Sequence, residues 1–187
     1  MSNSKLIKLN ELLKTLKSGN EQAFSKALSQ IDSVLTLESL PALVSIFHEN
    51  LSDKNREELL AFFNNLSAED AQETMIQVLY DPANLAIRQE VLSTIWNSRL
   101  DYSSYLAEFV EIAIEGDYLE ALECLTVIEN LEEPFEESDI LEAQLHLKEY
   151  LEQGQNNDQK AILISEIALL IKNFNEELAD FDLDDLD

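Results

Sequence analysis

Hydrophobic residues recur every three or four positions along almost the whole chain, and the gaps between these stretches are rich in Gly, Pro, Asp, Ser and Asn. This period is typical of amphipathic α-helices, because residues three and four positions apart lie on one helix face. The pattern predicts about ten helices, with short connections between them. Their predicted ranges are 5–17, 20–36, 39–50, 53–66, 69–80, 83–98, 102–115, 117–131, 138–153 and 157–178.

Glycine and proline support these boundaries. The three glycines, Gly19, Gly116 and Gly154, each follow a predicted helix, where a left-handed residue is expected to end it. Pro41 and Pro82 fall in the first turns of predicted helices, a position that proline tolerates. Because short connections favour antiparallel neighbours, we expect an all-α fold of about five antiparallel helical hairpins.

The hairpins are similar to one another in sequence. Residues 56–65 align with residues 88–97 at an offset of 32, and residues 120–125 continue the series 30 residues later. The preceding helices repeat as well, with 43–47, 75–79 and 109–113 at spacings of 32 and 34. A period in the low thirties with two helices per repeat predicts that each hairpin packs its apolar face against the next.

The clearest repeat spans residues 71–98. In it Met75-Ile76-Gln77-Val78-Leu79-Tyr80-Asp81-Pro82 leads through Ala86-Ile87-Arg88 to Val91-Leu92. This pattern resembles the HEAT-like and armadillo-type helical repeat proteins, with the best match over residues 39–131. The resemblance implies a right-handed α-solenoid, here a single helical-repeat domain over residues 1–178 whose terminal hairpins act as caps.

Charge and composition narrow the function classes. The net charge of −26 would repel a phosphate backbone, so no nucleic-acid partner is expected. No apolar run is long enough to cross a bilayer, and the N-terminus lacks a signal-peptide core. The single cysteine, Cys124, cannot form an internal disulfide. These features predict a cytoplasmic protein without a membrane partner.

The charge is uneven along the chain. The net charge is +2 over residues 1–34, −6 over residues 35–100 and −22 over residues 101–187. The acidic stretch 179–187 also spaces its apolar residues too widely to build a core, so we expect a disordered C-terminal tail.

Few residues have the type and spacing that a catalytic or metal-binding site requires. His48 and His146 are 98 positions apart and lack a second histidine at ligand spacing, and no serine lies in a nucleophile elbow. The acidic run 132–139 does not match the calcium loop of an EF-hand. We therefore expect no catalytic residue, no metal and no cofactor, and a protein that is not an enzyme.

Binding positions are suggested by the repeats themselves. Trp96 aligns with Asn64 and Thr126, and Phe62 aligns with Thr94 and Cys124, so these aromatic residues stand where sister repeats are polar or small. Both are candidate partner contacts, although Trp96 could instead cap the core. Phe181, Leu183 and Leu186 of the tail are candidates for a short docking motif, with a merely solubilising tail as the alternative.

The function predicted from the sequence is a protein–protein interaction scaffold or adaptor, with a partner that is expected to be basic. Two alternatives stay open. The unlike charges of the two ends could join molecules head to tail in a self-assembly, or the acidic surface could imitate nucleic acid and inhibit a nucleic-acid-binding protein.

Overall fold

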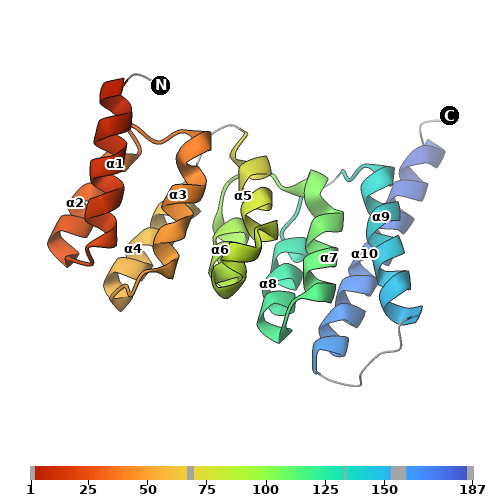
Figure 1. Ribbon diagram of the computed structural model, residues 1–187. Helices are drawn as coiled ribbons and strands as arrows, with labels where there is room; N and C mark the ends of the chain where they lie inside the picture. Colours follow the sequence, from red (N-terminus) through yellow and green to blue (C-terminus); the bar gives the residue numbers. More distant parts are fainter. Residues whose placement is uncertain (1–2, 67–69, 133, 153–158, 185–187) are drawn as a thin grey trace. The chain divides into compact units, whose positions relative to one another are not determined.

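The computed structural model describes residues 3–66, 70–132, 134–152 and 159–184, with side chains up to Glu176 in the last range. Over these residues the fold is all-helical, with ten α-helices, four short 3-10 helices and no strand (Figure 1). None of the described helices has the length and apolarity that a membrane crossing requires. The chain forms two compact units, an N-terminal unit of Met1–Leu100 and a C-terminal unit of Asp101–Asp187. The single domain predicted over residues 1–178 stays a prediction.

The N-terminal unit holds three helical hairpins. Its α-helices are α1 (Asn3–Lys17), α2 (Glu21–Ile31), α3 (Leu40–Val44), α4 (Asp53–Asn64), α5 (Ala71–Tyr80) and α6 (Arg88–Asn97). The short 3-10 helices are η1 (Leu37–Ser39), η2 (Ser45–His48) and η3 (Pro82–Ile87). The second helix of each hairpin packs against the second helix of the next, α2 on α4 and α4 on α6. The first helices α3 and α5 also pack together. Its core includes the fully buried Phe24, Leu43 and Phe63.

The C-terminal unit holds two hairpins. Its elements are η4 (Ser103–Tyr105), α7 (Leu106–Glu115), α8 (Tyr118–Glu129), α9 (Glu137–Glu152) and α10 (Gln159–Asp184). The first helices α7 and α9 pack together, and so do the second helices α8 and α10. Tyr102, Leu106 and Phe109 are buried in its core. The Cys124 thiol is fully buried within α8.

Ten helices were predicted, and the described part of the chain forms ten α-helices, several of them shorter than predicted. The stretch 39–50 divides into α3 and η2, and 83–98 divides into η3 and α6. At the second break Asp81 accepts a hydrogen bond from the Ala83 backbone N–H at 2.9 Å, which closes a turn around Pro82. Periodicity missed these breaks because a 3-10 turn places side chains at nearly the same spacing as an α-helix.

Side-chain caps define three helix starts. Asn20 accepts a hydrogen bond from the Ala23 backbone N–H, and Ser52 accepts one from the Asn55 backbone N–H. Asp117 and Glu120 form a reciprocal capping box at the start of α8. Each cap satisfies backbone donors that have no partner within the helix, and each marks the start of the second helix of a hairpin.

The glycine prediction is right for Gly19 and wrong for Gly116, while Gly154 lies outside the described residues. Gly19 has the expected left-handed φ of 71°. Gly116 is extended, with φ −70° and ψ −179°. It is required for space, because a Cβ there would lie 2.6 Å from Glu120 Oε2 and 2.8 Å from the Ile112 carbonyl oxygen. The capping box of α8 thus approaches the end of α7 too closely for a side chain.

A lysine from α10 caps the end of α7. Lys160 Nζ donates to the carbonyl oxygens of Ile114 and Gly116, the latter at 2.6 Å. A cation is favoured there because the last carbonyl groups of a helix carry partial negative charge. This contact fixes α10 against the α7–α8 turn.

We predict that Gly116→Ala destabilises the fold by about 1–3 kcal/mol, because the Ile112 carbonyl is backbone and cannot move aside. Urea unfolding followed by circular dichroism measures the change. Adding Glu120→Ala should not restore stability, since it removes the side-chain clash and the cap together. A Gly116→Ala protein as stable as the parent would mean that this turn relaxes freely.

Candidate functional site

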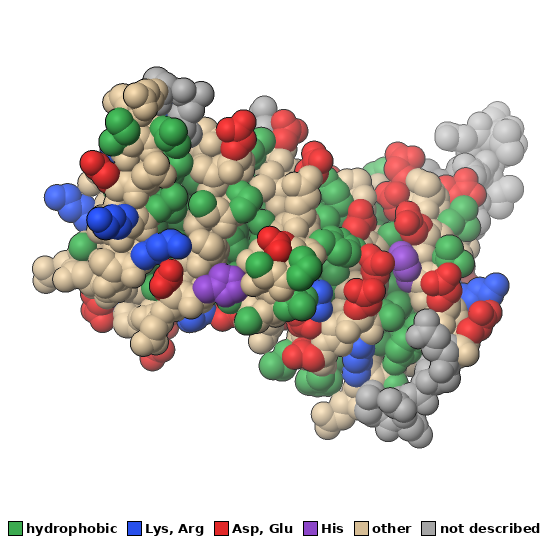
Figure 2. Space-filling view, viewed as in Figure 1, with side chains coloured by type: hydrophobic (Ala, Val, Ile, Leu, Met, Phe, Trp, Pro, Cys, Tyr) green, Lys and Arg blue, Asp and Glu red, His purple; other side chains and the backbone are tan. Residues whose placement is uncertain are grey.

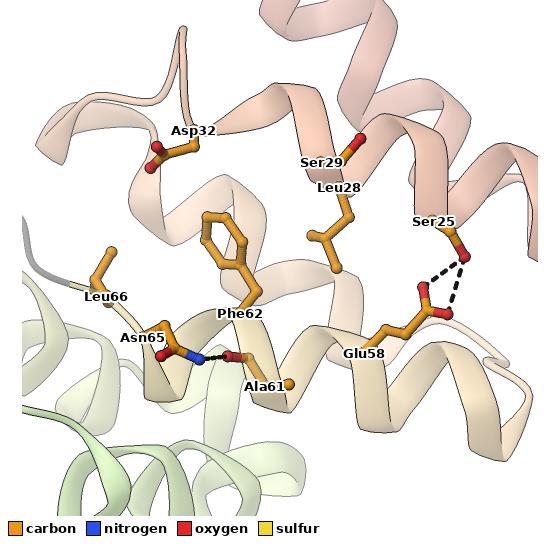
Figure 3. A pocket seen from close by; sticks show the side chains of 9 residues that line it. All are labelled: Ser25, Leu28, Ser29, Asp32, Glu58, Ala61, Phe62, Asn65 and Leu66. Atoms are coloured by element: carbon orange, nitrogen blue, oxygen red, sulfur yellow. Dashed lines mark hydrogen bonds between the residues drawn. The ribbon is translucent and has the colours of Figure 1, made fainter.

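An open groove of about 500 Å³ lies between the second helices α2 and α4 of the N-terminal unit (Figure 3). Each helix supplies one stripe of side chains at i, i+3, i+4 and i+7, and Leu66 completes the lining. The stripe from α2 consists of Ser25, Leu28, Ser29 and the C-cap residue Asp32. The stripe from α4 consists of Glu58, Ala61, Phe62 and the C-cap residue Asn65.

The middle of the groove is apolar. Leu28 and Leu66 are buried, whereas Phe62 is half-buried between them and packs edge-on against the buried Phe63 at 5.8 Å between ring centroids. Figure 3 shows the Phe62 ring pointing into the space between α2 and α4. Phe62, predicted as a partner contact, therefore lines a concave surface. The edge-on contact with Phe63 limits the freedom of its ring.

The two ends of the groove are acidic. Glu58 lies at one end and Asp32 at the other, with the apolar side chains between them (Figure 3). Seven residues of helix separate Ser25, next to Glu58, from Asp32, which corresponds to about 10 Å. The groove therefore offers an apolar surface with a carboxylate at each end, and no Lys or Arg is among its lining residues.

Glu58 is held in place by contacts from α2. The Ser25 hydroxyl lies 2.6 Å and 2.9 Å from its two carboxylate oxygens. A similar cross-helix tie joins the next pair of second helices, where Arg56 Nη1 of α4 lies 2.6 Å from Glu90 Oε1 of α6. Glu58 and Glu90 are equivalent in the repeat alignment, so the same position ties α4 to α2 and α6 to α4. This places the two stripes of the groove side by side.

A second, smaller pocket of about 350 Å³ lies between α7 and α9 in the C-terminal unit. It is lined by Glu111, Ile114, Glu115, His146, Glu149 and Tyr150. Nearby on the same two helices, burial raises the pKa of Glu108, and the neighbouring carboxylates of Glu142, Asp139 and Glu111 raise it further. Figure 2 shows Asp and Glu side chains over much of this unit's visible face. The acids here repel one another, and any ligand would have to be cationic.

Trp96 is 37% exposed on α6. Trp96 and Phe62 do not belong to one site, because Phe62 lines the α2–α4 groove and Trp96 does not. Both residues lie on second helices of the N-terminal unit, and their roles as partner contacts stay predictions. The groove residues Leu28, Glu58, Asp32 and Leu66 were not identified from the sequence.

The C-terminal candidates lie largely beyond the described side chains. Helix α10 continues to Asp184, six residues past its predicted end, so the backbone at Phe181 and Leu183 is helical. Their side chains and the whole of Leu186 lie outside the described residues. The disorder predicted for 179–187 and the docking role of these three residues stay predictions.

The two histidines occupy separate places. His48 Nε2 lies 3.1 Å from Asn84 Oδ1, and the Asn84 amide donates to the Val78 carbonyl at 3.0 Å. This chain of contacts joins η2 to η3, so it has a structural role. His146 lines the α7–α9 pocket. Within the described ranges, His, Cys, Asp and Glu form no cluster of three or more that could hold a metal ion.

No protein-family model, curated protein or solved structure matches the chain.

We predict that Glu108→Gln raises the melting temperature by roughly 1–3 °C at about pH 7, a modest change because Glu108 is partly solvated. The folded-state pKa is raised, so the folded state holds its proton over a range where the unfolded state has lost it. Stability therefore falls as pH rises through this range, and the gain from the substitution should vanish below about pH 4. Thermal unfolding from about pH 4 to pH 8 measures it.

The matched control is Glu57→Gln, which neutralises an exposed acid on α4. It should leave the pH profile nearly unchanged. A lower melting temperature for Glu108→Gln at neutral pH would show instead that the Glu108 carboxylate makes a net favourable contact.

Proposed function

We propose that this protein is an interaction scaffold that binds a basic protein segment in the α2–α4 groove. The groove is the observation that carries the proposal, because it combines an apolar centre around Phe62 with a carboxylate at each end. Apolar surface supplies affinity and charge supplies orientation and selectivity. The net charge of −26 adds a long-range attraction for a basic partner.

We further infer that the five hairpins form a right-handed α-solenoid of the HEAT-like type. Burial at equivalent positions supports this inference: Leu59, Val91 and Ala121 are all buried, and so are Phe63, Ile95 and Leu125. The packing order of the helices within each unit supports it as well. In such a fold the second helices share one face, which is the face that carries the groove.

The geometry of the groove suggests the form of the ligand. Two basic side chains about 10 Å apart would reach Glu58 and Asp32. An extended peptide presents residues i, i+2 and i+4 on one side, and the long, flexible side chains of Arg or Lys at i and i+4 can reach both carboxylates. The side chain at i+2 would then lie over Phe62 and Leu28. We expect the recognised segment to carry Arg or Lys at positions i and i+4 with a large apolar residue at i+2.

A fluorescein-labelled peptide with two Arg residues four positions apart and a Leu midway between them tests the proposal. We expect fluorescence anisotropy to show saturable binding that Phe62→Ala weakens at least about fivefold, since an aromatic residue at the centre of a contact dominates its affinity. Glu58→Gln and Asp32→Asn should each weaken binding without unfolding the protein. Added salt should also weaken it.

Two controls make this result specific. The same peptide with Glu in place of Arg should not bind, and Tyr118→Ala, which removes an aromatic that is 41% exposed on α8, should leave affinity unchanged. Binding that salt abolishes but Phe62→Ala leaves intact would refute a groove and favour charge-dominated mimicry of nucleic acid.

The other predicted contacts are tested by affinity capture from native extract with the parent chain, Trp96→Ala and a chain ending at Leu178. We expect the protein partner recovered by the parent chain to be reduced at least about threefold with one variant, because exposed aromatic residues are frequent contact hot spots. Quantitative mass spectrometry measures the recovery. Equal recovery with all three would remove Trp96 and the tail as contacts and leave only the groove.

A further inference from the structure

The first helix of the N-terminal unit begins with an exposed stretch. Residues 3–8 of α1 are all exposed, whereas Leu9 and Leu16 further along the helix are buried. Two large aliphatic side chains belong to this stretch, Leu6 with 47% and Ile7 with 53% of its surface exposed. The N-terminal unit therefore leaves the beginning of α1 uncovered on every side.

This uncovered stretch is basic as well as apolar. Lys5 and Lys8 flank Leu6 and Ile7 in the sequence, and four consecutive residues complete one helical turn, so together they form one continuous surface. We call these four residues the basic end of α1. Acids are favoured at the beginning of a helix because the first backbone N–H groups carry partial positive charge, but α1 has no acid in its first turn. The basic end thus combines three sources of attraction for an anionic, apolar segment.

The charge of the whole helix has the same sign. Helix α1 contains four Lys and one acid, Glu11, a net charge of +3, and Lys side chains are visible over the first hairpin in Figure 2. Glu49 lies 3.6 Å from Lys17 and offsets one of these charges. Each of the other nine α-helices in the described part of the chain is neutral or negative. Helix α1 is therefore the place where an acidic segment is attracted.

The C-terminal segment 179–187 has the complementary composition. It contains five Asp, no Lys or Arg, and the large apolar residues Phe181, Leu183 and Leu186. Helix α10 continues to Asp184 and has no basic residue in its last turn, so the partial negative charge of the helix end adds to that of the aspartates. The two ends of the chain thus match each other in charge, and both carry apolar side chains.

We propose that the C-terminal segment 179–187 of one copy binds the basic end of α1 in a second copy, so that molecules associate head to tail. Leu6 and Ile7 supply the apolar contact, and Lys5 and Lys8 attract the aspartates. The contact uses the first helix of the N-terminal unit and leaves the α2–α4 groove free. It therefore does not depend on the proposed function.

The large net charge of the chain is compatible with this contact. The +2 of residues 1–34 and the −6 of residues 35–100 leave the N-terminal unit with −4, whereas residues 101–187 carry −22. A head-to-tail contact sets the acidic segment against the less charged unit, while a contact between two C-terminal units would oppose their full charges. Beyond about 10 Å, charges are largely screened at about 0.1 M salt, so the local attraction dominates.

Sedimentation velocity of the full chain over a concentration series tests the proposal. We expect the sedimentation coefficient to rise past that of a dimer, because a head-to-tail contact that does not close continues to add copies. Raising NaCl from about 50 mM to about 500 mM should increase the dissociation constant at least about tenfold, since salt screens the attraction. A chain that is monomeric at every concentration, or an association that salt strengthens, would overturn the proposal.

A matched pair of variants locates the contact. Lys8→Glu should weaken the association at least about tenfold, because the new acid repels the aspartates. Lys26→Glu makes the same charge change at an exposed position of α2 and should associate like the parent chain. Equal weakening by both variants would show that only net charge matters and would contradict a site on α1.

Mixing two full-length variants tests the head-to-tail geometry. A chain with Lys5→Glu and Lys8→Glu keeps the C-terminal segment, and a chain with Phe181→Ser, Leu183→Ser and Leu186→Ser keeps the basic end. We expect each to be monomeric alone and an equimolar mixture to form a one-to-one dimer that grows no further. A mixture without a dimer, from variants that circular dichroism melts show to be folded, would refute the contact.

Unfolding is an improbable cause of the loss in the first variant. An acid at position 5 suits the first turn of α1, so its melting temperature should not fall.

Discussion

The packing of apolar helix faces between neighbouring helices is the interaction on which the rest of this structure depends. Most of its helices are only 10–12 residues long, and helices of that length are marginal in water by themselves. Leu59 and Phe63 of α4, or Phe109 of α7, gain their stability by being fully enclosed by adjacent helices. Each hairpin therefore needs a neighbour, and helix sides without one expose aliphatic residues such as Leu141 of α9 and Ile162 of α10.

Polar contacts between helices determine how the packed helices are aligned with one another. The ties from Ser25 to Glu58 and from Arg56 to Glu90 join successive second helices at equivalent positions. Each contributes about 1 kcal/mol at most in such partly solvated places, far less than the apolar core. Their effect is to fix which stripe of one helix faces which stripe of the next, and the groove around Phe62 results from that alignment.

The sequence by itself determined the all-helical fold and nearly every helix, because a 3.6-residue period survives without any knowledge of neighbours. It could also have given the caps at Asn20, Ser52 and Asp117, since a cap needs only residues within one turn. It identified Phe62 through its contrast with Thr94 and Cys124. The stripe at 58, 61, 62 and 65 could have been found in the same way, as a run at helical spacing.

Only the tertiary structure decided that this stripe lies beside Ser25, Leu28, Ser29 and Asp32, because that pairing depends on how α2 packs against α4. It also showed that Gly116 is required for space and not for a left-handed backbone, since the close atoms belong to Glu120 and Ile112. The sides of α9 and α10 that stay exposed were likewise beyond sequence pattern alone. Periodicity shows that a helix has an apolar side, but packing decides which apolar residues are enclosed and which remain exposed to a partner.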